Sequence, residues 1–245
     1  MGTLNSTATN VVISQPMYFP WVGLLEQIRL SDVFIHYSDV QFARGGFFNR
    51  VQIKTVRGSD WLTVPLRDQH LGQLISEVVI DERFDWRSNH REILRHAYRN
   101  TPYLDDLLSI FDDVVSAHVS NLADLSIASV MALAEYFDLT SNRQFHDSRD
   151  LGISGSSSQR VLDLTIKVGG TTYITGHGAS NYLDHEIFET AGITVQYINY
   201  RLSDYPQLHG AFTPYVTALD LVANCGPEGS EVIRSTTIPW REFIK

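Results

Sequence analysis

Polar side chains follow two apolar runs near the start of the sequence. The first run is followed by Gln15 and Tyr18, and the second by Asp39 and Gln41. If the two runs are parallel neighbouring strands of an open α/β sheet, their carboxyl ends meet at one crevice, and ligands bind in that crevice. Amide and phenol groups there can hydrogen-bond a polar ligand, and a carboxylate can accept a proton from an attacking group. The spacing predicts one site shared by these four side chains.

A second set of candidates follows a strand expected at 171–175. The chain continues through Gly176, His177 and Ser180 into a helix expected at 181–190. Glycines let a backbone approach a ligand closely, and free N–H groups at a helix start attract anions. A serine cap after glycines is also common where no ligand binds. We interpret this segment as the second half of the pocket.

Other side chains could complete the pocket. Flat aromatic rings and amide or guanidinium groups are the types needed to hold a sugar or a base and to stabilise an oxyanion. The further candidates are Trp21, Asn49, Arg50, Tyr205 and Asn224. Cys225 is the single cysteine, and it could act as a nucleophile with His177 or His209. No local catalytic-cysteine signature surrounds it, and a lone buried cysteine is usually inert packing.

The elements expected to position these residues alternate between strands and helices. A strand at 11–13, a helix at 22–30 and a strand at 33–37 form a right-handed crossover unit. The later expectations are a hairpin of 47–55 with 61–66, a strand at 76–81, helices at 86–99, 104–115, 122–137 and 159–168, and strands at 171–175 and 193–200. Asp85 is expected to cap the helix that starts at Trp86. The glycine- and serine-rich segment 142–158 is interpreted as a loop, either mobile over a ligand or a surface connection.

The fold class that follows is α/β, with a Rossmann-like open, mostly parallel sheet, a β-hairpin and a helical insertion. We expect a disordered N-terminus over 1–10 and a single α/β domain over 11–245, with a helical subdomain at about 85–140.

Composition excludes several classes of function. The chain has 245 residues and a net charge of −9, so it lacks the broad basic surface expected of a nucleic-acid-binding protein. One cysteine allows no intrachain disulfide, and nine histidines without metal-binding spacing argue against a zinc site. The N-terminus lacks the regions of a signal peptide, and no apolar run reaches the roughly 20 residues of a membrane helix. The expectation is a soluble cytoplasmic protein without membrane insertion.

An ordered set of motifs resembles the WbqC-like family found in bacterial surface-polysaccharide gene clusters. The resemblance covers about residues 11–234. The motifs are QPMYFPWVG, DVFIHYSDVQF, GGFFNRVQIKT, WLTVPL, YRNTPYLDDL, GHGASNYLDHEIFETAGI, YPQLHGAFTP and LDLVANCGPE. The family also has a histidine at the place of His90 and a tyrosine and an aspartate at the places of Tyr182 and Asp184.

The resemblance implies an enzyme that N-acylates a nucleotide-linked amino sugar, with glycine a plausible acyl group. Such an enzyme needs a base for the sugar amine, and Asp39, His90 or Asp184 could serve. It also needs oxyanion donors, which Gln41, Asn49, Arg50 or the Gly176 backbone region could supply. No cofactor is certain. The activated donor could be a thioester or an aminoacyl-tRNA, presented by a carrier protein or by tRNA, or ATP could activate a free acid.

Two alternatives remain open from the sequence. The first unit faintly resembles the nucleotidyltransferase and pantothenate-synthetase group, which would make the protein an ATP-dependent amide ligase. That group's HxGH motif is absent, since Pro20-Trp21-Val22-Gly23 stands in its place. The other alternative is a noncatalytic sugar-nucleotide-binding protein that recruits a partner enzyme. The oligomeric state is left open.

Overall fold

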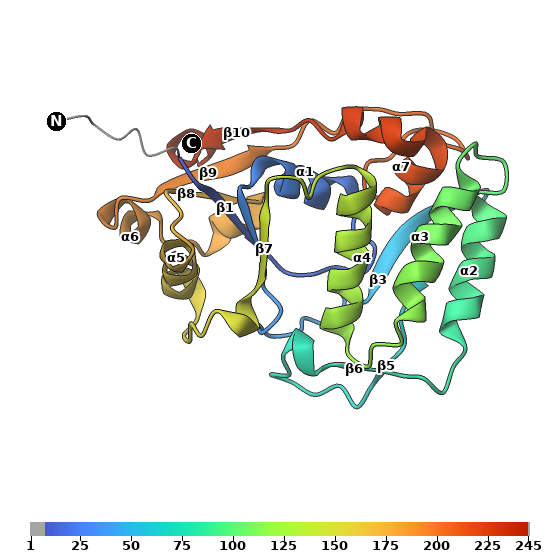
Figure 1. Cartoon of the computed structure of the whole chain (residues 1–245), viewed down its shortest axis with the longest axis horizontal. Coiled ribbons are helices and arrows are strands. Elements are labelled where there is room, and N and C mark those ends of the chain that lie inside the picture. The colour runs from blue at the N-terminus through green and yellow to red at the C-terminus, as the bar shows by residue number, and fades with distance from the viewer. Residues whose placement is uncertain (1–7, 245) are drawn as a thin grey trace.

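The computed structural model describes residues 8–244 and contains a six-stranded sheet in the order β10-β9-β8-β1-β2-β7 (Figure 1). The strands are β1 (Asn10–Ser14), β2 (Val33–His36), β7 (Gln144–Asp147), β8 (Thr172–Thr175), β9 (Thr194–Asn199) and β10 (Thr236–Pro239). Five strands run parallel, and β10 is antiparallel to β9 at one edge. The prediction of an open, mostly parallel α/β sheet is confirmed.

The order of the strands creates a reversal point between β1 and β8. From β1 the chain moves to β2 and then β7 on one side, and it returns to β8 and β9 on the other side. Loops leaving β1 and β8 therefore diverge, and a crevice forms outside the carboxyl ends of these two strands.

Helices cover both faces of the sheet because its strands are apolar on both sides. Val12 and Phe34 face one hydrophobic cluster with α1 (Val22–Leu30) and α4 (Leu122–Tyr136), while Val11 faces a second cluster. That second cluster includes side chains of α5 (Ser157–Lys167) and α6 (His185–Thr190). Alternate residues of a strand point to opposite faces, so a parallel strand covered on both sides reads as a continuous apolar run.

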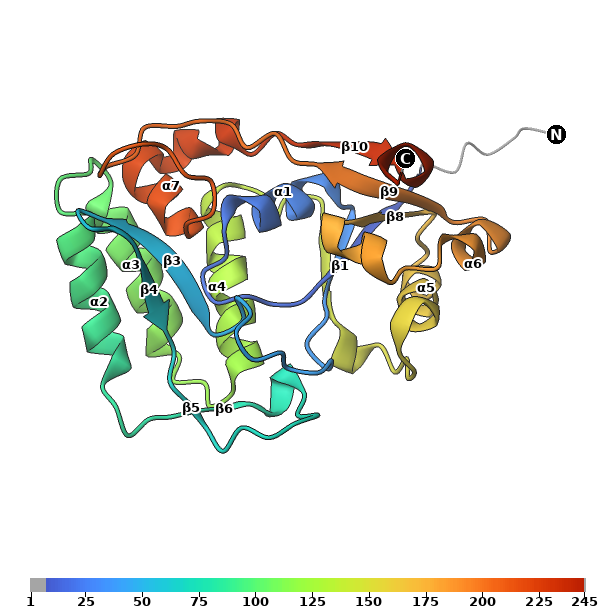
Figure 2. The ribbon, with the colours of Figure 1, turned by 180° about the vertical axis from the view of Figure 1, so that it is seen from behind.

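A long insertion separates β2 from its neighbour β7 and forms the other half of the molecule (Figure 2). It contains the antiparallel pairs β3 (Arg50–Thr55) with β4 (Gly58–Thr63) and β5 (Leu66–Arg67) with β6 (Val79–Ile80), followed by α2 (Trp86–Ala97), α3 (Leu104–Ser116) and α4. As expected, the Asp85 side chain accepts from the backbone N–H of Ser88 and caps α2. From later in the chain, α7 (Ala218–Cys225) packs against α3, and α8 (Trp240–Phe243) ends the described chain.

Several expected elements differ from the structure. The interpretation of 142–158 as a loop is wrong at two places, because Gln144–Asp147 form the sheet-edge strand β7 and Ser157 begins α5. The strand expected at 76–81 shrinks to Val79–Ile80 after a 3₁₀ turn. The helix expected from residue 181 begins at His185, with Asp184 as its cap.

Of the N-terminus expected to be disordered, residues 1–7 lie outside the described part, and Asn10 already belongs to β1. Within residues 8–244, no helix combines the length and apolar character needed to cross a membrane.

Candidate functional site

A cleft of about 980 Å³ lies at the reversal point of the sheet. Its lining comes from the carboxyl ends of β1 and β8, the loop after β2 and the start of α5. Gln15 and Gly176 stand on its two sides, directly after β1 and β8. Small-molecule sites of α/β proteins lie at this place in the fold and have volumes of this order. This cleft is the candidate functional site.

Five of the residues predicted from the sequence line the cleft. They are Gln15, Asp39, Gln41, Gly176 and Tyr182. The sequence argument placed the first three together because β1 and β2 would be parallel neighbours, and the two strands do pair in that way. The structure therefore brings residues near 15–41 and near 176–182 to one cavity.

Asp39 is held from two directions. Its Oδ1 accepts a hydrogen bond from the Ser148 hydroxyl at 2.5 Å, and its Oδ2 accepts one from the Arg160 guanidinium at 2.5 Å. The Arg160 side chain is 6% exposed and that of Asp39 is 22% exposed, so the ion pair is largely shielded from water. Arg160 also lies over the Tyr37 ring, 5.0 Å from its centroid.

Sequence reasoning missed Arg160 and Ser148. Arg160 belongs to α5, and Ser148 follows β7, the strand that was interpreted as a loop. Both contacts to Asp39 join residues more than 100 positions apart in the chain. A helix pattern with an arginine on one face gave no signal that this arginine reaches a carboxylate after β2.

The remaining cleft lining is uncharged. Asp39 and Arg160 are the charged side chains among the residues that line it, and they neutralise each other. Hydrogen-bonding groups and phenol rings make up most of the rest, including Gln15, Gln27, Gln41, Ser156, Tyr173 and Tyr182. Such a lining suits a ligand rich in hydroxyl or amide groups more than one with many charges.

A smaller cavity of about 340 Å³ adjoins the cleft. The two share Asp39, Gly155 and Arg160 in their walls, so the ion pair stands between them. A second reactant could approach Asp39 from this side.

Tyr18 and His90 lie outside the cleft. Both side chains are buried, and the Tyr18 hydroxyl lies 3.0 Å from His90 Nδ1. Burial lowers the pKa of His90 to about 4, because the charged imidazolium would lose its hydration. This pair connects the loop after β1 to α2 inside the core.

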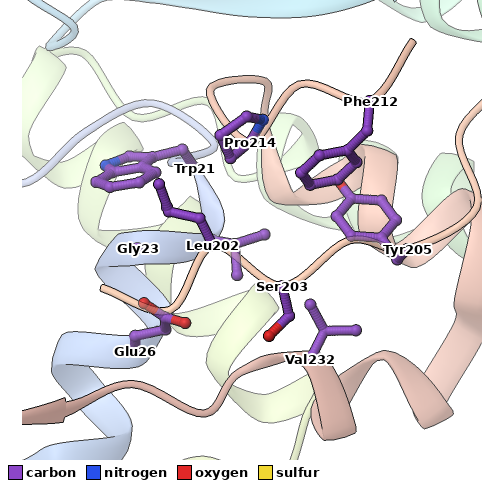
Figure 3. A pocket seen from close by; sticks show the side chains of 10 residues that line it. Trp21, Gly23, Glu26, Leu202, Ser203, Tyr205, Phe212, Pro214 and Val232 are labelled. Carbon is purple, nitrogen blue, oxygen red and sulfur yellow. The ribbon is translucent and has the colours of Figure 1, made fainter. Parts of the chain in front are cut away.

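Trp21 and Tyr205 lie at a different small crevice (Figure 3). It is lined also by Glu26, Phe212 and Pro214, and its volume is only about 10 Å³. That space holds no more than about one water molecule, so it is too small for a sugar. Tyr205 was predicted to contribute to the cleft, but it is not among the residues that line it.

Asn49 and Arg50 support the β-hairpin region. Asn49 Nδ2 donates to the Val64 carbonyl at 2.9 Å, and Arg50 bonds to carbonyls of the turn before it and lies over the Trp61 ring. Neither side chain lines the cleft.

Three predicted side chains of the connection from β8 to α6, those of His177, Ser180 and Asp184, do not line the cleft. His177 Nε2 contacts the Ile198 carbonyl at 2.7 Å, and the Ser180 hydroxyl donates to the His177 carbonyl. The Asp184 carboxylate accepts from the Glu186 N–H and caps α6. The backbone of this connection lines the cleft at Gly176 and Gly178, while these three side chains do not.

Asn224 belongs to a buried polar cluster beyond the cleft. Its Nδ2 donates to Asp220 on the same helix, and burial raises the pKa of Asp220 to about 6. Cys225 follows it, and burial raises the pKa of the Cys225 thiol. A thiol with a raised pKa is mostly protonated at neutral pH and is a poor nucleophile. Within the described range, no three His, Cys, Asp or Glu residues cluster in a way that could hold a metal ion.

Comparisons with known proteins point to one family. The sequence model of the WbqC-like protein family matches residues 15–232. "Uncharacterized protein Rv1507c" of Mycobacterium tuberculosis is 30% identical over 227 residues, which cover 91% of this chain and 97% of that protein. No solved structure matches the chain.

Proposed function

The chain belongs to the WbqC-like protein family, and from that premise we propose that it is an N-acyltransferase, with an aminoacyl group such as glycyl, acting on a nucleotide-linked amino sugar. The observation that carries the proposal is the setting of Asp39. It is a carboxylate with a fixed orientation at the edge of a large cleft whose other lining residues, apart from its partner Arg160, are uncharged.

The proposed reaction makes one amide bond. The sugar nitrogen attacks the acyl carbon, the bond from that carbon to the sulfur or oxygen of the donor breaks, and the nitrogen loses a proton. Asp39 is the proposed acceptor of this proton. A carboxylate has about four acceptor positions, and Ser148 and Arg160 occupy one on each oxygen. Acceptor positions therefore remain for a substrate amine.

The cleft also offers groups for the other steps. The amides of Gln15 and Gln41 can donate to sugar hydroxyls or to the carbonyl oxygen as it gains charge. Tyr182 supplies a ring at the rim. The adjoining cavity gives the acyl donor a separate approach to Asp39. Among the predicted bases, His90 and Asp184 lie away from the cleft lining, so Asp39 is the base that we retain.

One observation favours a second candidate, a noncatalytic sugar-nucleotide-binding protein. Both oxygens of Asp39 already have partners, Ser148 and Arg160, and an ion pair held in this way suits a binding site that performs no reaction. A binding protein would use the same uncharged lining without needing a base.

Product analysis separates these candidates. The protein is incubated with an amino sugar linked to a nucleoside diphosphate, once with a preactivated glycyl donor and once with glycine and ATP, and the products are weighed by mass spectrometry. We expect the glycyl amide with the preactivated donor. Asp39→Asn should lower turnover by roughly a hundredfold, whereas Asp112→Asn, which alters an exposed ion pair, should not.

The outcomes distinguish the alternatives. Product that forms only with ATP indicates a ligase. Tight binding of the sugar nucleotide without product under either condition indicates the binding protein. No binding of any nucleotide-linked amino sugar contradicts both.

A further inference from the structure

Three aromatic side chains form a surface beside the cleft, which we call the aromatic shelf: Trp21, Tyr200 and Tyr215. The Trp21 ring centroid lies 5.1 Å from that of Tyr200 and 6.0 Å from that of Tyr215, and the rings are tilted by 45° and 40°. Tyr215 is 56% exposed, while the other two are half-buried. Single exposed aromatic residues are ordinary on protein surfaces. Three adjoining rings, each at least partly exposed, together offer an apolar aromatic surface.

The shelf is held in place by its backbone. Trp21 stands at the start of α1, and its ring lies against Gly23, where a Cβ would come within 2.2 Å of the indole (Figure 3). The Trp21 backbone also forms a bridge to Thr217, and the Ala218 N–H donates to the Pro20 carbonyl at 2.7 Å. The position of the indole is therefore fixed before any ligand arrives.

The shelf is continuous with the cleft through Gln27. This residue lines the cleft, and its Nε2 donates to the Tyr200 hydroxyl at 2.9 Å. The same hydroxyl lies 3.2 Å from the position that a Cβ on Gly176 would take, and Gly176 is also part of the cleft wall. A ligand leaving the cleft past Gln27 meets the Tyr200 ring.

The sheet sets the span between the shelf and Asp39. Tyr200 follows β9 and Asp39 lies beyond β2, and the strand order β9-β8-β1-β2 puts three spacings between them. Neighbouring strands are about 4.8 Å apart, so the span is on the order of 14 Å. A ligand that reaches both places must be about as long as this span. A sugar and a base joined by a diphosphate make up such an elongated ligand.

We propose that the aromatic shelf stacks the nucleobase of the nucleotide-linked amino sugar while its sugar occupies the cleft near Asp39. This inference rests on the proposed function and adds the place of the nucleoside. The physical reason is that every nucleobase has a π-face that stacks on aromatic side chains, whereas the uncharged polar lining of the cleft matches sugar hydroxyls.

Calorimetric titrations with two ligands test the proposal. One ligand is uridine diphosphate, and the other is a uridine-diphosphate-linked hexosamine, with thymidine and guanosine analogues tested in parallel. Tyr215→Ala should weaken the binding of both ligands by roughly five- to a hundredfold. Asp39→Asn should weaken the sugar-linked ligand and leave the diphosphate nearly unchanged. Phe84→Ala is the matched control, because Phe84 is 59% exposed and is not among the residues that line the cleft.

Each result decides one claim. If the sugar-linked ligand binds and depends on Asp39 but not on Tyr215, the shelf proposal is overturned and the proposed function stands. If Tyr215→Ala weakens the sugar-linked ligand but not uridine diphosphate, the shelf holds the sugar and the proposal is again overturned. If no nucleotide-linked hexosamine binds, the proposed function fails and the shelf proposal fails with it.

Discussion

The Tyr18 hydroxyl meets Nδ1 of His90 at 3.0 Å in the core, between the loop after β1 and helix α2. Both residues were expected at the site from the sequence, and the structure joins them to each other instead of to the cleft. Trp86 packs edge-on against both rings. The pair anchors the loop that leads from β1 to α1, so it affects the cleft through the path of the chain.

Removing the Tyr18 hydroxyl should affect stability more than activity. Tyr18→Phe leaves His90 Nδ1 without its partner, and we expect the free energy of unfolding to fall by about 1–2 kcal/mol. Turnover per folded molecule should stay the same. Urea denaturation and the acyltransfer assay measure the two quantities, with Ser116→Ala as the control for loss of an exposed hydroxyl. A large loss of turnover without loss of stability would place Tyr18 in the reaction.

The Asp39–Arg160 pair should be strongly coupled. Arg160→Leu leaves a shielded carboxylate without its cation, and we expect the unfolding free energy to fall by about 2–4 kcal/mol. Adding Asp39→Asn should recover part of that loss, because the neutral amide needs no cation. The exposed pair Arg91–Asp112 is the control, and breaking it should cost at most about 1 kcal/mol. If the changes in unfolding free energy caused by Arg160→Leu and Asp39→Asn simply add in the double variant, the two side chains do not interact.

Acid should destabilise the protein through His36. This histidine is buried between aromatic rings, no described residue hydrogen-bonds either ring nitrogen, and burial lowers its pKa to about 4. In the unfolded chain its pKa is near 6.5, so between pH 6.5 and 4 the unfolded state binds more protons. The contribution of His36 to stability is complete above pH 6.5 and is lost as the pH falls toward 4.

Denaturation at several pH values checks this expectation. His36→Phe should reduce the loss of stability between pH 7 and pH 4 by about 2–3 kcal/mol. His90 has the same sign of shift, so some pH dependence should remain. His96→Gln, at an exposed position, is the control. If His36→Phe and the unaltered protein lose the same unfolding free energy between pH 7 and pH 4, another group must stabilise the charged imidazolium of His36 in the folded protein.

Cys225→Ser should retain most of the activity. The thiol is half-buried, its pKa is raised by burial, and it lies beyond the cleft lining. A serine keeps the size of the side chain, so little change in folding is expected. Steady-state turnover and labelling with a thiol reagent measure the effect. Abolished turnover in a folded variant would indicate a covalent acyl intermediate on this residue.

The first β–α–β unit could be predicted from the sequence because burial there is uniform. Val11 and Phe34 stand in short apolar runs, and the strands that they form are covered on both faces. Strand β7 could not be recognised in the same way. At the sheet edge it has only one neighbour, and Gln144 and His146 flank the single apolar residue Phe145. Its polar composition resembles that of a loop.

From the sequence, the site residues could be predicted only where they directly follow the ends of strands. Gln15, Asp39 and Gln41 were located by the rule that parallel strands end at one crevice. The rule failed for Tyr18, because after Pro16 the chain turns into the core, where the Tyr18 N–H donates to the Phe48 carbonyl. It also gave no information on Arg160, whose contact with Asp39 spans 121 positions. Side-chain partners at such separations depend on the tertiary fold.

Because of the insertion between β2 and β7, the binding site can form only after most of the chain has folded. Asp39 precedes the insertion and Ser148 follows it, so their contact closes a loop of 109 residues. Closing so long a loop has an entropic cost that falls only after the inserted helices have collapsed and brought its ends together. A nascent chain that has emerged only to the end of α4 lacks the strand, the serine and the arginine that orient Asp39. The protein should therefore become able to bind its ligand late in folding and in a single step, after the last parallel strands have joined the sheet.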